Sequence, residues 1–104
     1  MLEIKELSKL VKEEVCDAKK YADLALKWQE KDKQVADTFY SLSGQELQHM
    51  EMLHNQVTRL INNYRQTKGE PPKEMLAIYE YVHDEQIEAV SEVKILLNMY
   101  KGVS

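Results

Sequence analysis

The chain has 104 residues, which suits one domain (residues 1–104) with a thin hydrophobic core, and a formal net charge of −4 at pH 7. Hydrophobic residues make up 43% of the chain and charged residues 31%, a balance typical of globular proteins. The negative charge and the lack of a basic stripe argue against nucleic acid as a partner. No apolar run approaches the roughly 20 residues that span a bilayer, so we expect no membrane partner.

The cysteine content and the N-terminal residues indicate the cellular compartment. The single cysteine, Cys16, excludes an internal disulfide and any site built from clustered thiolates. Residues 1–12 carry charges at every turn and do not resemble a signal peptide. We therefore expect a cytoplasmic location.

Good helix formers dominate the chain, and two breaks divide it. The first break is the charged run at residues 29–33, where Asp32 can cap the helix that follows. The second is at residues 68–72, where Gly69 fits a helix C-terminus and a proline fits the next helical start. The pattern predicts an all-α fold with helices over about 2–29, 33–67 and 72–101. Short connections predict antiparallel neighbours.

The third predicted helix is apolar over a wide arc, because two of its faces are about equally apolar. One face has residues at 3–4 spacing from Ile78 and Val82 to Leu96 and Met99. Such an arc suits packing against more than one neighbour. We therefore expect a second subunit to contact it, giving a homodimer or a larger homo-oligomer.

Three polar residues lie on the apolar stripes of the first two helices. Glu14 lies on the first stripe, and Glu46 and His49 lie on the second at a spacing of three, which places both on one helix face. Glu-x-x-His on inward-facing helices is the ligand motif of di-iron and di-manganese carboxylate bundles. Buried charges are normally paired or bind metal, so these positions predict a metal site.

The heights of the three residues along the hairpin agree. If the first two helices fold about residues 31–32, Glu14 and His49 each lie about 17 residues from the turn and Glu46 about 14, which is within one helical turn. The same folding about Glu70 brings Glu92 to this height, and we predict Glu92 as a fourth ligand. Glu85, Glu88 and His83 remain alternatives for that position.

Carboxylates with one imidazole suit iron, manganese or zinc. The carboxylate-rich set favours a dinuclear iron centre over a catalytic zinc site, although manganese or zinc remain alternatives. Such a centre usually has two histidines and four carboxylates. The chain supplies one clear Glu-x-x-His half, and a two-fold dimer would supply the other half by repetition.

The residues of the first two helices resemble the ferritin-like superfamily, in particular its rubrerythrin branch. In that branch a ligand Glu is followed seven residues later by Tyr, as Glu14 and Tyr21 are here. Its second helix has a Phe seven residues before the ligand Glu and a His three after it, as Phe39, Glu46 and His49 stand here. The resemblance implies an antiparallel bundle with a dinuclear iron centre that oxidises Fe(II) or reduces peroxide.

The chain departs from that pattern in having three helices and one well-placed motif. Encapsulated ferritins are similarly short and build their metal site between two subunits. The segment 92–101 resembles a C-terminal helix of short ferritin-like proteins, and residues 101–104 do not look like an encapsulin-targeting tail. Gly44 costs about 1 kcal/mol relative to Ala inside a helix, which we interpret as allowing close helix approach or a local bulge.

Other interpretations remain open for each of these residues. Glu46 and His49 would otherwise form a polar patch in which His49 bonds to a neighbouring carboxylate, Glu14 would pair with a basic residue, and Glu92 would be solvated. His54 and His83 are expected at the surface or at an interface. For the whole protein, the alternative is a non-enzymatic helical assembly module that retains vestigial site residues. A zinc hydrolase is a third hypothesis, disfavoured by the carboxylate-rich shell.

Overall fold

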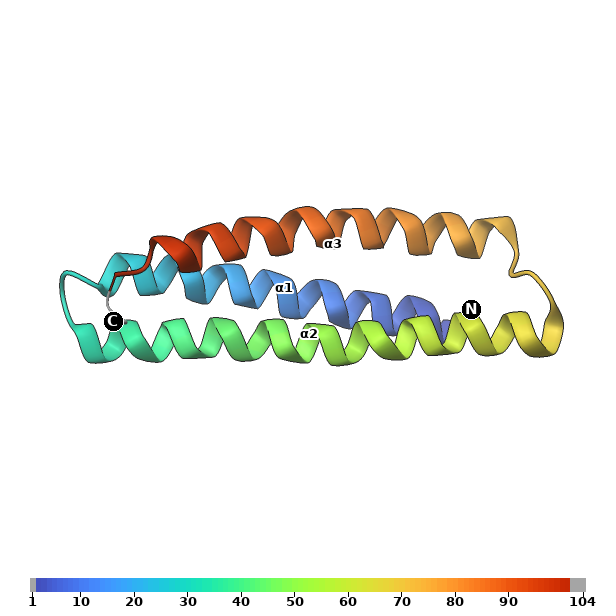
Figure 1. The fold of residues 1–104 in the computed structure, drawn as a ribbon, viewed down its shortest axis with the longest axis horizontal. Coiled ribbons are helices and arrows are strands. Elements are labelled where there is room, and N and C mark those ends of the chain that lie inside the picture. The colour runs from blue at the N-terminus through green and yellow to red at the C-terminus, as the bar shows by residue number, and fades with distance from the viewer. Residues whose placement is uncertain (1, 102–104) are drawn as a thin grey trace.

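A computed structural model describes residues 2–101, apart from the side chains of Leu2, Ile78 and Val82. It contains three long α-helices, α1 (Leu2–Trp28), α2 (Lys33–Lys68) and α3 (Lys73–Met99), in a rod of 55 × 20 × 17 Å (Figure 1). Regular structure over the described residues is entirely helical, which confirms the all-α prediction. None of these helices is long and apolar enough to cross a lipid bilayer.

The helices alternate in direction along the chain. α2 runs antiparallel to both of its neighbours in sequence, so α1 and α3 run parallel to each other (Figure 1). α1 lies between the other two in this view and contacts both of them. The N-terminal ends of α1 and α3 therefore lie at the same end of the rod as the C-terminal end of α2.

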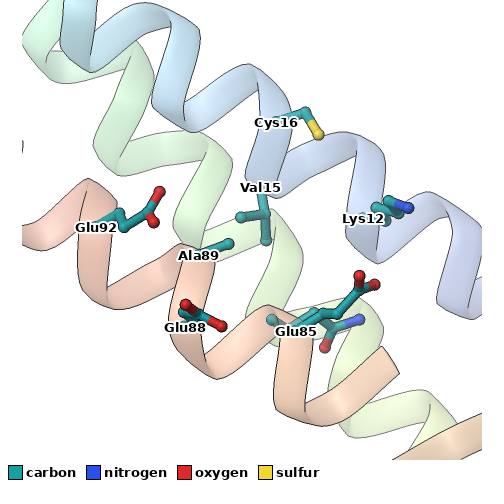
Figure 2. A pocket seen from close by; sticks show the side chains of 8 residues that line it. Lys12, Val15, Cys16, Glu85, Glu88, Ala89 and Glu92 are labelled. Atoms are coloured by element: carbon teal, nitrogen blue, oxygen red, sulfur yellow. The ribbon is translucent and has the colours of Figure 1, made fainter. Parts of the chain in front are cut away.

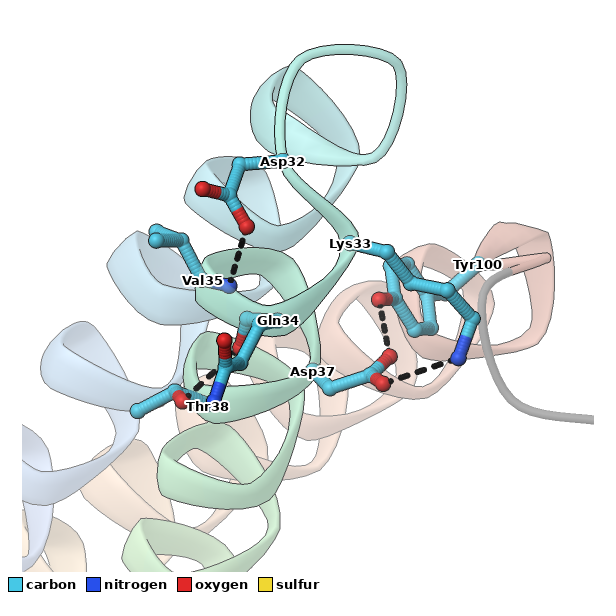
Figure 3. Close-up of polar contacts among 7 residues, drawn as sticks. All are labelled: Asp32, Lys33, Gln34, Val35, Asp37, Thr38 and Tyr100. Atoms are coloured by element: carbon cyan, nitrogen blue, oxygen red, sulfur yellow. Dashed lines mark hydrogen bonds and ion pairs between the residues drawn. The ribbon is translucent and has the colours of Figure 1, made fainter.

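The first connection is a tight turn. The backbone N–H groups of Lys31 and Asp32 both donate to the carbonyl of Trp28 at 2.9 Å, which ends α1 one residue before the predicted position. The Asp32 carboxylate then accepts from the N–H of Val35 at 3.2 Å, as Figure 3 shows. Asp32 is thus the N-cap of α2, as the sequence predicted, because its side chain satisfies a backbone donor that has no partner within the helix.

The second connection depends on Gly69. Its φ of 89° is a conformation that side chains with a Cβ rarely adopt, and its N–H donates to the carbonyl of Arg65 at 3.2 Å. Pro72 is the N-cap of α3 and not, as predicted, its first helical residue. α3 consequently begins at Lys73, one residue later than the sequence indicated.

The end of α3 is fixed by Tyr100. The backbone of this residue is extended (φ −72°, ψ 125°), so α3 ends at Met99 and not at residue 101. The Tyr100 phenol donates a 2.5 Å hydrogen bond to Asp37 of α2, whose other carboxylate oxygen lies 3.0 Å from the Lys33 ammonium (Figure 3). The ring also stacks on Tyr40, with the ring centroids 4.9 Å apart. These contacts hold the chain after α3 against the start of α2.

The hydrophobic core runs the length of the rod as three clusters. One cluster lies at the end of the rod where the chain connects α2 to α3, and it contains Ile4, Val57, Ile61 and Met75. Ala18, Ala22 and Val93 lie near the middle, and Ala25, Ala36 and Tyr100 lie at the other end. The small side chains of α1 at 3–4 spacing present a narrow face that allows α2 and α3 to approach closely.

Candidate metal centre

The α1–α2 hairpin brings Glu14 to the same level as Glu46 and His49. Glu14 lies near the midpoint of α1 and His49 near the midpoint of α2. The register of the two helices is fixed about one turn away, where the hydroxyl of Ser43 donates to the carbonyl of Ala18 at 2.6 Å. Because both residues are fully buried, a slip of either helix would leave this hydroxyl without a partner.

The three side chains converge on one point. Nδ1 of His49 lies 3.6 Å from Oε2 of Glu14 and 3.8 Å from Oε1 of Glu46. One ligand atom from each residue lies within 4.8 Å of the others, and no other such trio of His, Cys, Asp or Glu occurs among the described residues. The convergence that the hairpin arithmetic predicted is therefore present in the structure.

The burial of the trio is graded. The side chains of Glu46 and Glu14 are 18% and 26% exposed, whereas that of His49 is 54% exposed. Oε2 of Glu14 is buried and has no hydrogen-bond partner. A buried carboxylate oxygen without a partner costs free energy unless a cation or a proton satisfies it. This oxygen is thus the atom of the trio that most needs a ligand.

The Glu14 carboxyl group disturbs the ionisation of Glu46. The pKa of Glu46 is raised to about 7, chiefly by a hydrogen bond with Glu14, then by burial and by the negative charge of Glu14. His49 acts in the opposite direction and lowers this pKa. Below about pH 7 the Glu46 carboxyl group thus holds a proton. A metal cation would replace that proton and favour the ionised form of Glu46.

The trio lies on a face of the hairpin that α3 does not cover. Cys16, which lines the groove between α1 and α3, is about 200° around the helix from Glu14. On the trio's face, Tyr21 and Phe39 stack with ring centroids 6.1 Å apart. Beyond His49, the 67% exposed Met52 lines a shallow groove on α2. The three ligand candidates are therefore flanked by apolar side chains that water reaches.

The structure does not bring Glu92 to the trio. Its carboxylate lies 3.9 Å from the ammonium of Lys19, and its side chain is 55% exposed. Figure 2 shows Glu92 with Glu85 and Glu88 on α3, beside a groove whose other wall is α1, including Cys16 and Lys12. The alternatives Glu85 and Glu88 also line this groove, and neither is part of the trio.

His83, the remaining alternative, lies against His54 of α2 and not against the trio. Nε2 of His54 lies 2.9 Å from Nδ1 of His83. The sequence predicts both residues at the surface or at an interface, and nothing in their spacing indicates that they meet. A further expectation concerned Gly44: a Cβ built there meets nothing within 4 Å, so no close helix approach within the described chain requires this glycine.

The chain matches no known protein-family model, no curated protein and no solved structure. The functional conclusion therefore depends on the residues of the site itself.

Proposed function

We propose that this chain is a ferritin-like metal protein in which Glu14, Glu46 and His49 bind iron. The observation that carries the proposal is the convergence of these three side chains, with Oε2 of Glu14 buried and lacking a hydrogen-bond partner. Two carboxylates and an imidazole are ligands that suit iron, manganese and zinc. The resemblance to the rubrerythrin branch favours iron among these three.

A second copy of the chain would complete the centre. The trio lies near the midpoint of the hairpin with His49 exposed to solvent, and a two-fold axis through that point would repeat each ligand. The assembled site would then have four carboxylates and two imidazoles, the set found in dinuclear carboxylate bundles. Two hairpins joined in this way make a four-helix bundle and bury the apolar side chains beside the trio. Glu92 is not needed as a ligand in this arrangement.

Bound iron would supply electron-transfer chemistry with O₂ or peroxide, and the protein residues would have three tasks. Glu14 and Glu46 would compensate the cation's charge, and their repulsion in the absence of metal would favour its binding. His49 would supply a nitrogen ligand. Tyr21 and Phe39, with their counterparts from the second copy, would exclude water from one side of the centre. The proposed activity is oxidation of Fe(II) or reduction of peroxide.

The test is anaerobic titration of the protein with Fe(II), followed by exposure to air. We expect one tightly bound iron for each chain, a doubling of the mass by light scattering, and an absorbance change on oxidation. Glu14→Gln and His49→Gln should each remove the binding. Glu6→Gln is a matched control, because Glu6 is an exposed carboxylate on the same helix as Glu14. Equal iron binding by Glu14→Gln and by the unaltered protein would overturn the proposal.

The alternative is a helical assembly module without metal chemistry. The large exposed apolar side chains of α3 favour association of some kind; they are Tyr81, Ile87, Ile95 and Met99. The same measurements separate the two proposals. An oligomer that forms without metal and is unaffected by Glu46→Gln would favour the assembly module.

A further inference from the structure

Two histidines from different helices meet away from the trio. Nε2 of His54 on α2 lies 2.9 Å from Nδ1 of His83 on α3. Their rings are stacked at 27°, with centroids 5.0 Å apart, and the ring of Tyr79 stacks on both. The contact is between side chains more than a helical turn from Glu14, Glu46 and His49 in sequence. It is therefore a separate cluster with its own chemistry.

The pair separates the interior of the rod from an open groove. On one side, both rings border a small void of about 10 Å³ lined by buried residues such as Val11 and Val57. On the other side, both line a groove of about 410 Å³ between α2 and α3, which Glu51 and Lys94 also line. An ion can thus approach the imidazoles from solvent while their inner side stays packed.

We propose that His54 and His83 form a second metal site, which binds a divalent ion such as Zn²⁺, Ni²⁺ or Cu²⁺, with Glu51 as a carboxylate ligand. Imidazole nitrogens prefer these borderline ions. With metal–nitrogen bonds of about 2.1 Å, two nitrogen ligands lie about 3.0 Å apart in an octahedral site and about 3.4 Å apart in a tetrahedral one. The observed 2.9 Å is close to the octahedral spacing.

The imidazoles can provide both lone pairs without a net release of protons. In the hydrogen-bonded pair, one contacting nitrogen carries the proton and the other accepts it. On binding, that proton moves through solvent to the other nitrogen of the same ring, and both rings turn so that their lone pairs meet at the ion. Burial, and then the neighbouring His83, lower the pKa of His54, which keeps its imidazole neutral and available at neutral pH.

Glu51 is the candidate third ligand because of its place on α2; its carboxylate does not lie within 4.8 Å of both imidazole nitrogens, so its exposed side chain would turn toward the ion on binding. Glu51 lies one turn before His54, the same spacing that Glu46 and His49 have, and it lines the same groove as both imidazoles. Glu80 has the same spacing to His83 on α3, but it does not line the groove. Glu80 is therefore a matched control for Glu51: we expect Glu51 to bind the ion and Glu80 not to bind it.

An ion at this place would tie α2 to α3 through side chains of both. α3 packs principally on α1, so the ion would add a connection between the two outer helices. Because the ion binds the folded chain, it should raise the temperature of unfolding in proportion to the logarithm of its concentration. This effect is separate from iron binding at the trio, since the two sites share no residue.

The test uses Cu²⁺ as the probe in a Glu46→Gln, His49→Gln double variant, which removes the trio and leaves two histidines in the chain. We expect one Cu²⁺ for each chain by calorimetry, and an electron paramagnetic resonance spectrum split by two nitrogen nuclei. His83→Gln should weaken binding about 100-fold or more and leave the splitting of one nitrogen. Glu51→Gln should weaken it about tenfold, and Glu80→Gln should leave it unchanged.

Cu²⁺ binding that is unaffected by His83→Gln, or a spectrum without two-nitrogen splitting in the parent variant, would overturn the proposal. Circular dichroism would check that each variant is folded. If His83→Gln does not fold, His54→Gln replaces it with the same expectation. Because the parent variant lacks the trio, failure here leaves the proposed iron centre intact, and loss of iron binding elsewhere leaves this site intact.

Discussion

The hydroxyl of Ser43 donates a 2.6 Å hydrogen bond to the carbonyl of Ala18 between two helices, with both residues fully buried. Ala18 is one turn from Glu14 on α1, and Ser43 is one turn from Glu46 on α2. Since the bond fixes the register of the hairpin, it also fixes which carboxylates meet.

Replacing Ser43 with alanine should therefore affect both stability and metal binding. The loss of one buried hydrogen bond should lower the free energy of unfolding by about 1 kcal/mol. Urea unfolding measures this change, and iron titration should show weaker binding. Ser41→Ala is the control, because Ser41 is exposed on the same helix. An equal loss of stability in both variants would contradict the role given to the Ser43 hydroxyl.

The metal-free protein should lose stability as the pH rises from about 4.5 to about 7. The pKa of Glu46 is raised in the folded chain from 4.5 to about 7 by its hydrogen bond with Glu14, by burial and by the charge of Glu14. Between these values the folded chain holds a proton that the unfolded chain releases. The stabilisation is thus complete below about pH 4.5 and is lost as the pH passes about 7.

Glu46→Gln should remove this pH dependence, because glutamine does not titrate. Thermal unfolding in the presence of a chelator, at several pH values, measures the difference between the two proteins. Glu88→Gln serves as the control, since Glu88 is exposed on α3. The same slope in Glu46→Gln and in the unaltered protein would show that another group is responsible.

Gly44→Ala should stabilise the chain by about 1 kcal/mol. A glycine inside a helix loses more backbone entropy on folding than alanine does, and a Cβ at this position meets nothing within 4 Å. Gly69→Ala is the opposing control: its φ of 89° disfavours a Cβ, so the same substitution should destabilise. Urea unfolding of both variants gives the comparison. A loss of stability in Gly44→Ala would indicate a contact made by another copy of the chain.

Tyr100→Phe should release the end of the chain from α2. Burial and the Asp37 carboxylate raise the pKa of Tyr100 to about 12 from its ordinary 10.0. The stability linked to this phenol is complete below about pH 10 and is lost as the pH rises through about 12. Alkaline unfolding followed by tyrosinate absorbance should therefore lose its latest phase in the variant. Tyr64→Phe, at the other end of α2, should retain that phase.

Local signals in the sequence are sufficient to predict the helices and their ends. Asp32 and Gly69 act through backbone groups within four residues, so the positions of the helix ends can be predicted to within two residues. The convergence of Glu14 with Glu46 was also predictable, because a short turn fixes the register of a hairpin. These predictions required only helical geometry and the position of the turn.

The placement of α3 could not be predicted in the same way. Its apolar arc is wide, and residues 69–72 do not determine on which side of the hairpin it lies. α3 packs principally on α1, where Glu92 lies 3.9 Å from Lys19, and it also contacts α2. The contact of His54 with His83 depends on that packing, since it joins α2 and α3 across a separation of 29 residues. Long-range contacts of this kind leave no periodic signal in the sequence.

The parallel direction of α1 and α3 leaves the rod electrically polar. Each helix carries a partial positive charge of about half a unit at its N-terminus and a similar negative charge at its C-terminus, so three helices leave one dipole uncompensated. Acidic residues in the first turns of α1 and α3 reduce the positive excess at one end, whereas basic residues in the last turn of α2 add to it. Two rods lying side by side in opposite directions would cancel the remainder. The odd number of helices thus favours an antiparallel side-by-side dimer over a parallel dimer in which like ends of the two rods lie together.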